Sequence, residues 1–194
     1  MRVENMKIAV IYGSVREKRQ GIRVAKYIVN QLNDRGIENV FVDVREHQLP
    51  FLNKMYKEYK GDAPNEIERV HQIFESADGF IIVSGEYNHG LPPALKNLLD
   101  HYQSEYHFKP SGLATYSAGM FGGVRAAMHL RAVTSELGMP SVPTTFPVPS
   151  VGKNFDEDGA TENEHINKGF DRFLIEFMWY AEALKTKRET DGKP

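Results

Sequence analysis

Two kinds of hydrophobic pattern alternate along this chain. Short, nearly continuous apolar runs predict strands that are covered on both faces, and longer segments with apolar residues at every third or fourth position predict helices that bury one face. Glycine or proline stands at several of the boundaries between them. The pattern predicts strands over residues 7–13, 39–44, 78–84, 113–117 and 142–146, and helices over residues 21–35, 64–77, 92–102, 124–137 and 170–184.

This order of elements determines the expected fold class. Strand-then-helix units joined by short turns predict an α/β protein with one doubly wound, five-stranded parallel sheet and helices on both faces. We expect a single domain over residues 1–185 and a charged C-terminal tail over residues 186–194 that frays. Such sheets bind ligands beyond the carboxyl ends of their strands, at the topological switch point. The loops after the first, third and fourth strands are therefore the candidate site.

Composition and charge exclude several classes of function. The 194 residues contain 24 Lys and Arg against 26 Asp and Glu, and a formal net charge of -2 indicates neither a nucleic-acid partner nor an anionic membrane partner. No apolar run approaches the roughly 18 residues of a membrane span. Residues 1–6 are too few and too polar for the core of a signal peptide. The absence of cysteine excludes disulfide scaffolds, cysteine-ligated metals and thiol catalysis, and we expect a cytoplasmic location.

The first candidate loop, residues 13–21, has the chemistry of an anion site. It offers the Ser14 hydroxyl, the cations of Arg16, Lys18 and Arg19, and a following helix N-terminus whose dipole favours a negative charge. A phosphate is the expected occupant, with the Arg16 guanidinium as a fork of donors. The alternative is a solvated basic turn. The spacing is neither that of a Walker loop nor that of a dinucleotide fingerprint.

The other two loops are suited to a flat ligand. In residues 84–92, Tyr87 and Asn88 can present an aromatic edge and an amide to a planar ring, although an exposed surface turn would have the same composition. His89 has no evident carboxylate or serine neighbour, so a loop histidine is favoured over a general base. In residues 116–125, clustered glycines let the backbone approach a ligand and donate N–H groups to it, or simply form a tight turn.

Together the three loops carry a recognisable set of motifs. They are Gly13-Ser-x-Arg16, Glu86-Tyr-Asn88 followed by Leu95-Lys-Asn97 and Asp100, and Ser117-x-Gly-x-x-Gly-Gly-x-Arg125. In this order and spacing the chain resembles the NADPH-dependent FMN reductases of the flavodoxin-like superfamily, which include quinone, azo and chromate reductases. The resemblance extends over residues 7–185.

The resemblance implies a cofactor, an activity and a set of binding residues. FMN would accept a hydride from NAD(P)H and pass it to a quinone or similar small acceptor, such as FMN, an azo compound or chromate, by a ping-pong mechanism. No side chain is implied as a catalytic acid or base, and no metal is implied. The implied FMN contacts are Ser14, Arg16, Gln20, Gly21 and Ile22 at the phosphate, Glu86, Tyr87, Asn88 and His89 along the isoalloxazine and ribityl chain, and Ser117, Gly119 and Gly122 at the pyrimidine end.

Some residues depart from the family pattern or have only a supporting role in it. Gly85 stands where relatives usually carry a proline or another side chain, which would loosen the loop over the flavin. Lys96 and Asn97 are implied to brace the loop that precedes them. An acidic stretch at residues 156–159 lacks the ligand spacing of a calcium loop, so we expect no calcium there.

Assembly and function each have an alternative. The cluster Leu95, Leu98, Leu99 and Tyr102 and the pair at residues 179–180 exceed what one helix face buries, which favours a homodimer or homotetramer; the alternative is a wide stripe buried within one chain. The alternative functions are a flavodoxin-type electron carrier and a flavin-dependent sensor. The basic first loop and near-neutral net charge count against the carrier.

Overall fold

The protein folds around one parallel sheet. The computed structural model describes residues 6–193, so most of the N-terminal segment that we judged too polar for a signal peptide lies outside the described residues. The five strands are ordered β2-β1-β3-β4-β5, and every pairing is parallel. This arrangement confirms the predicted fold class. The strands are β1 (Lys7–Tyr12), β2 (Glu38–Asp43), β3 (Gly79–Gly85), β4 (Ser111–Tyr116) and β5 (Phe146–Val148).

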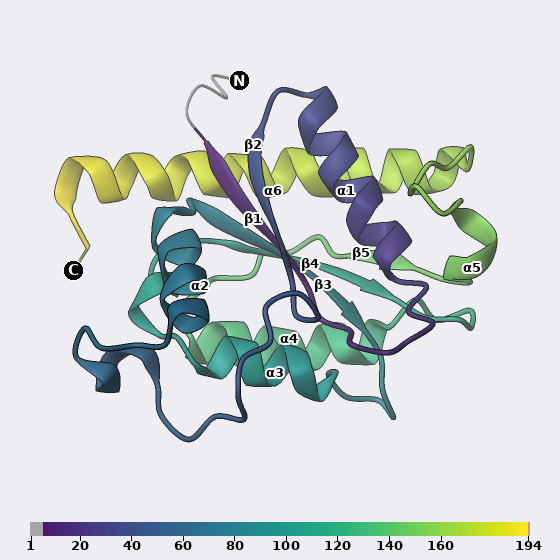
Figure 1. Cartoon of the computed structure of the whole chain (residues 1–194). Coiled ribbons are helices and arrows are strands. Elements are labelled where there is room, and N and C mark those ends of the chain that lie inside the picture. Colours follow the sequence, from purple (N-terminus) through teal and green to yellow (C-terminus); the bar gives the residue numbers. More distant parts are fainter. Residues whose placement is uncertain (1–5, 194) are drawn as a thin grey trace.

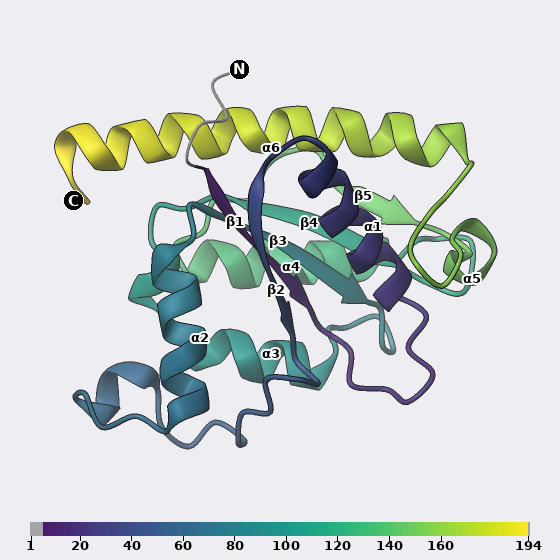
Figure 2. The ribbon, with the colours of Figure 1, turned by 45° about the horizontal axis from the view of Figure 1, so that its top comes forward.

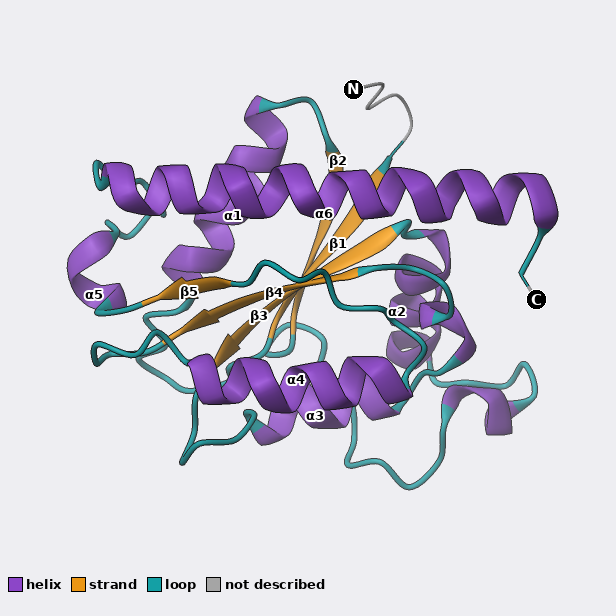
Figure 3. Cartoon of the chain, turned by 180° about the vertical axis from the view of Figure 1, so that it is seen from behind, coloured by secondary structure: helices purple, strands orange, loops and turns teal. Residues whose placement is uncertain are grey.

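Helices cover both faces of the sheet. The helices α1 (Ile22–Asp34) and α6 (Glu164–Asp191) lie on one face (Figures 1 and 2). The opposite face carries α2 (Asn65–Ser76), α3 (Pro93–Asp100) and α4 (Val124–Glu136), and the view from behind shows α6 and α4 on opposite sides of the strands (Figure 3). Residues 6–193 also contain three short helical turns: η1 (Tyr56–Tyr59), η2 (Ser104–Tyr106) and α5 (Val151–Asn154). None of the helices in residues 6–193 is long and apolar enough to cross a bilayer.

Each face of the sheet has its own hydrophobic core, because successive strand residues point to opposite faces. In β1, Ile8 and Val10 pack with α1 and α6, whereas Ala9 and Ile11 pack with α2 and α3. All of β3 is buried. A strand covered on both faces has no solvent side on which to place polar residues, which explains the continuous apolar runs in the sequence.

The fifth strand lies later in the chain than predicted. The sequence predicts it over residues 142–146, but β5 begins at Phe146, which pairs with Ala114. Backbone carbonyl groups before β5 are bonded to a side chain instead of a strand: Arg131 donates to the carbonyl oxygens of Val142 at 3.2 Å and Pro143 at 2.6 Å. Because these groups are bonded to a helix, and proline has no N–H to donate, the segment makes only one isolated bridge to β4, through Ser141.

The C-terminal segment that was expected to fray is instead helical. α6 continues to Asp191, and Pro194 lies outside the described residues. The end of the helix is anchored by Arg188, which donates to the carbonyl oxygen of Phe108 at 2.7 Å and to Asp78 at 3.1 Å. The charged composition of this segment indicated a solvated tail, but one of its charged residues, Arg188, anchors the helix, and its side chain is only 12% exposed.

Candidate cofactor site

The predicted loops meet at the switch point of the sheet. Strand order reverses between β1 and β3, where Tyr12 pairs with Val83, and on the next strand Gly85 pairs with Tyr116. A cavity of about 320 Å³ lies there, at the lower end of the range for small-molecule sites. Larger hollows lie on α6 and beside residues 44–51, away from this convergence. The cavity is lined by Ser14, Arg16, Lys18, Arg19, Gln20, Gly85, Glu86, Tyr87, Tyr116, Ser117, Ala118 and Val151.

Two arginines of the first loop have different roles: Arg19 holds the loop in place, and Arg16 leaves its guanidinium available to a ligand. Arg19 donates to the carbonyl oxygen of Ser14 at 3.0 Å and forms an ion pair with Asp43 on β2, so it holds the loop to the sheet. Arg16 is exposed, and within the described residues its guanidinium makes no ion pair or hydrogen bond. It lies 5.9 Å from the centroid of the Tyr87 ring. Arg16 therefore has its donors available for an anion.

Gly21 is required by packing rather than by its backbone angles. It is the N-cap of α1 with φ -66°, which any residue adopts, but a Cβ atom there would lie 1.9 Å from Cζ of Tyr116. The Tyr116 ring fills the space where a side chain would stand. The tight first turn of α1 beside the cavity thus depends on a tyrosine at the end of β4.

Tyr116 lines the cavity and Tyr12 is buried beside it, and the sequence analysis named neither. Both stand at strand ends, and their hydroxyl oxygens lie 3.4 Å apart under the cavity. Burial raises the pKa of Tyr12 to about 12 and raises the pKa of Tyr116 well above its ordinary value. Both therefore remain neutral hydroxyls at physiological pH. The only sequence signal was an aromatic residue as the last position of each of these two strands.

The second loop is tied to the first through a hydroxyl pair. The Tyr87 hydroxyl and Oγ of the buried Ser14 lie 2.6 Å apart. Tyr87 and Gly90 exchange two backbone hydrogen bonds, and the residues between them, Asn88 and His89, have φ of 49° and 67°. These left-handed angles are those of a tight hairpin turn. Asn88 and His89 are exposed at its tip and are not among the cavity-lining residues.

Glu86 has a structural partner that the motif did not indicate. Its carboxylate accepts hydrogen bonds from the backbone N–H groups of Arg125 at 3.0 Å and Ala126 at 3.3 Å. These are the first turn of α4, where unpaired N–H groups and the helix dipole favour a negative charge. Glu86 therefore fixes the second loop to the start of α4, and its side chain is already engaged without a ligand.

The third loop is shaped by the Ser117 hydroxyl. Oγ of Ser117 accepts from the N–H of Gly122 and donates to the carbonyl oxygen of Gly119, both at 2.9 Å. Gly122 and Gly123 have φ of 62° and 77°, in the left-handed region that favours glycine. Nothing lies within 4 Å of the position of a Cβ at Gly119. The backbone at Gly119 is therefore accessible to a ligand, whereas the Ser117 hydroxyl is hydrogen-bonded within the loop.

A fourth segment, after β5, also belongs to the site. Val151 of α5 lines the cavity, and a Cβ on Gly152 would lie 2.3 Å from Oε1 of Gln20. Arg23 of α1 donates to the carbonyl oxygen of Phe155 at 2.9 Å. These contacts fold the segment against the first loop. The misplaced fifth strand prevented its recognition from sequence, because the end of that strand was assigned too early.

Two supporting expectations are corrected by the structure. Asn97 accepts from the N–H of Leu52 and donates to the carbonyl oxygen of Pro50, both at 2.9 Å, so it braces the loop after β2 rather than the loop before its own helix. Lys96 forms an ion pair with Asp100.

The leucine cluster of α3 and Tyr102 are at most 1% exposed within one chain, so this cluster does not indicate a partner. Trp179, by contrast, is 63% exposed.

A doubly wound parallel sheet in the order β2-β1-β3-β4-β5, with the candidate loops at its switch point, defines an α/β protein of the flavodoxin-like fold class. A model of the family described as NADPH-dependent FMN reductase matches residues 6–153, and the chain belongs to this family. Membership confirms the resemblance based on the loop motifs. It also confirms the enzyme class, with FMN as the expected cofactor and NAD(P)H as the expected co-substrate.

Relatives support the family over nearly the whole chain. The chain is 33% identical over 190 residues to a 2-hydroxy-1,4-benzoquinone reductase of Burkholderia sp, covering 94% of this chain and 98% of that protein. It is 29% identical over 194 residues to an NAD(P)H:quinone oxidoreductase of Solanum tuberosum, covering 95% and 97% of the two chains. The solved structure of the flavoenzyme NAD(P)H:(acceptor) oxidoreductase FerB from Paracoccus denitrificans shares the fold, with a TM-score of 0.76 at 22% identity, over 92% of this chain and 98% of that one.

Proposed function

We propose that this protein is an FMN-dependent NAD(P)H:quinone oxidoreductase whose flavin lies in the cavity at the ends of β1, β3 and β4. Bound FMN would supply hydride transfer from NAD(P)H to a quinone or a comparable small acceptor, such as free FMN, an azo compound or chromate, with the two substrates using the site in turn. The observation that carries the proposal is the convergence of the three motif loops on one cavity. The names of the relatives that match nearly end to end support a quinone as acceptor.

The residues at the cavity fit FMN. Its phosphate would meet the unengaged guanidinium of Arg16, the Ser14 hydroxyl and the N-terminal end of α1. The cradle has no room for a larger side chain at Gly21. We place Gln20 and Ile22 in the same phosphate contact set.

The other two loops would hold the ring system mainly through backbone groups. The carboxylate of Glu86 and the hydroxyl of Ser117 are engaged in positioning their loops, so these residues would contact the flavin through main-chain atoms. The open backbone at Gly119 is suited to donating N–H groups to the pyrimidine end, where negative charge develops on reduction. Tyr87, Asn88, His89 and Gly122 complete the proposed contacts.

The proposed catalytic role of the protein is orientation and electrostatics. We assign no side chain of the cavity as a general acid or base. We further propose a cytoplasmic location, a homodimeric or homotetrameric assembly, and small molecules as the reacting partners rather than nucleic acid or a membrane.

The absorbance spectrum of the purified protein tests this function directly. We expect a flavin band that bleaches when NADPH is added without oxygen and returns when a quinone is added. Steady-state rates with varied NADPH and quinone should give parallel double-reciprocal lines. A protein that binds no FMN contradicts the proposal, and a bound flavin that NADPH does not reduce would indicate an electron carrier or a sensor instead.

Replacing Arg16 with alanine is expected to weaken FMN binding by about 1.5–3 kcal/mol, the range for a hydrogen bond to a charged group. Affinity for riboflavin, which lacks the phosphate, should be unchanged, because Arg16 is assigned to the phosphate alone. Fluorescence titration with both ligands measures the difference. The matched control is Arg69→Ala on α2, an exposed arginine that does not line the cavity. Equal FMN affinity in the Arg16 variant and this control would remove Arg16 from the phosphate site.

A further inference from the structure

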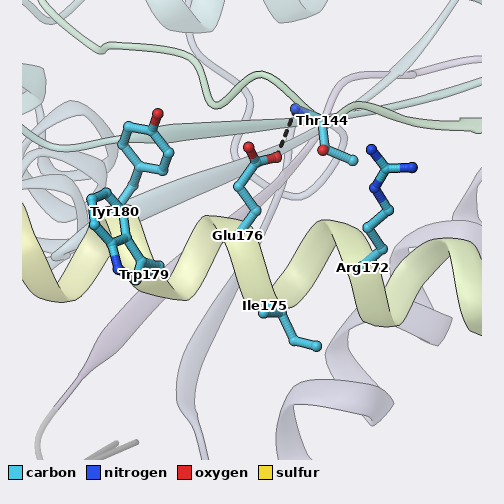
Figure 4. Close-up of a pocket in the computed structure, with 6 residues that line it drawn as sticks. All are labelled: Thr144, Arg172, Ile175, Glu176, Trp179 and Tyr180. Carbon is cyan, nitrogen blue, oxygen red and sulfur yellow. Dashed lines mark hydrogen bonds between the residues drawn. The ribbon is translucent and has the colours of Figure 1, made fainter.

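The outward face of α6 carries apolar side chains that no described residue covers. Trp179 is 63% and Ile175 is 58% exposed, and the Trp179 ring packs edge-on against the Tyr180 ring, with centroids 5.1 Å apart. Both border a hollow of about 710 Å³, shown in Figure 4. One wall of this hollow is fixed, because Glu176 accepts a hydrogen bond from the N–H of Thr144 at 2.8 Å. The hollow is lined by Thr144, Arg172, Ile175, Glu176, Trp179 and Tyr180.

The spacing of this face is that of a helix–helix seam. The outward residues Lys168, Arg172, Ile175, Trp179, Glu182 and Thr186 are separated alternately by four and three positions, the spacing of the a and d positions of a coiled coil, and the two at the centre, Ile175 and Trp179, are apolar while the other four are polar. The hollow includes Arg172, Ile175, Glu176 and Trp179, which are positions i, i+3, i+4 and i+7 of one helix. Four residues in this arrangement form the hole that receives one side chain of a facing helix.

The same face is complementary to itself when a second copy runs antiparallel. Ile175 and Trp179 stand two positions on either side of residue 177, and Arg172 and Glu182 stand five positions on either side. A twofold axis at residue 177 would therefore bring Ile175 against the partner's Trp179, and Arg172 beside the partner's Glu182. Within the described residues neither Arg172 nor Glu182 forms an ion pair, although four other cations of α6 do, two of them within the helix and two with Asp78.

We propose that α6 is an interface between two copies of this chain, in which the two helices pack antiparallel about residue 177. Trp179 of each copy enters the hollow on the other, and two Arg172–Glu182 ion pairs flank the apolar centre. The apolar contact supplies the affinity, while the charges select the antiparallel register. This interface is separate from the cavity at the strand ends, so it does not depend on flavin binding.

Sedimentation velocity across a dilution series tests the interface. The protein should self-associate, and Trp179→Glu should raise the dissociation constant by about 30-fold or more, the effect of removing a central aromatic anchor. Circular dichroism should be unchanged, because the side chain is 63% exposed in one chain. A tetrameric protein should fall to a dimer, and a dimeric one to a monomer.

A charge exchange distinguishes this pairing from any other use of the same face. Arg172→Glu and Glu182→Arg should each weaken association by about tenfold, and the double variant should return to within about threefold of the starting protein. The comparison variant is Met128→Glu on α4, another apolar residue that is 55% exposed. The proposal is wrong if the protein is monomeric throughout, if Trp179→Glu associates normally, or if the double variant is no better than the single ones.

Discussion

Gly21→Ala is expected to lower FMN affinity by more than about tenfold and to lower the free energy of unfolding by about 1–3 kcal/mol, the usual cost of overpacking. The new Cβ would lie 1.9 Å from Cζ of Tyr116, so one of the two must move. Tyr116 has little room, because it is only 8% exposed and its ring packs against the buried ring of Tyr12, with centroids 6.3 Å apart. The strain therefore displaces the first turn of α1, which carries the proposed phosphate contacts.

Denaturant unfolding and FMN titration measure the two effects separately. Gly169→Ala in α6 is the matched control, since nothing lies within 4 Å of its Cβ position and its φ is not positive. This control should gain about 0.5–1 kcal/mol, because alanine is the better helix former, and should bind FMN normally. If Gly21→Ala binds FMN like the unaltered protein, the tight contact between α1 and Tyr116 does not shape the site.

Asp78→Ala is expected to cost about 3 kcal/mol of stability without changing FMN affinity. The Asp78 carboxylate accepts from the N–H of Lys7 at 3.1 Å, from Lys185 at 2.8 Å and from Arg188 at 3.1 Å. Breaking a buried pair costs about 3–5 kcal/mol, and the 15% exposure of Asp78 places it at the lower end. Because Asp78 stands before β3, at the edge of the sheet opposite the cavity, the loss is confined to folding.

Urea unfolding gives the size of this loss. The control is Glu164→Gln, which removes the exposed pair with Lys168 on the same helix and should change stability by no more than about 0.5 kcal/mol. We therefore expect Gly21→Ala to impair FMN binding and Asp78→Ala to leave it unchanged. An Asp78 variant as stable as the control would show that α6 is held by its apolar face alone.

The order of strands and helices was accessible from the sequence because it depends on local pattern. Strands covered on both faces must be apolar throughout, and β1 and β3 were recognised for that reason. The same reasoning misplaced β5. Its predicted residues are apolar enough for a strand, but Arg131 and Glu176 from two helices occupy their backbone groups. No local pattern reveals that competition.

The sequence alone therefore determined the fold class, the family and the loops that form the site, since turn chemistry and strand hydrophobicity are properties of short segments. The tertiary structure decided what each side chain in those loops does. Ser14 meets Tyr87 from 73 positions away, and Glu86 meets the N–H of Arg125 from 39 positions away. These contacts arise only when parallel strands bring distant loops to one edge of the sheet. For that reason the sequence located the candidate site, but only the fold distinguished the donors that remain available to a ligand from the groups that hold the loops together.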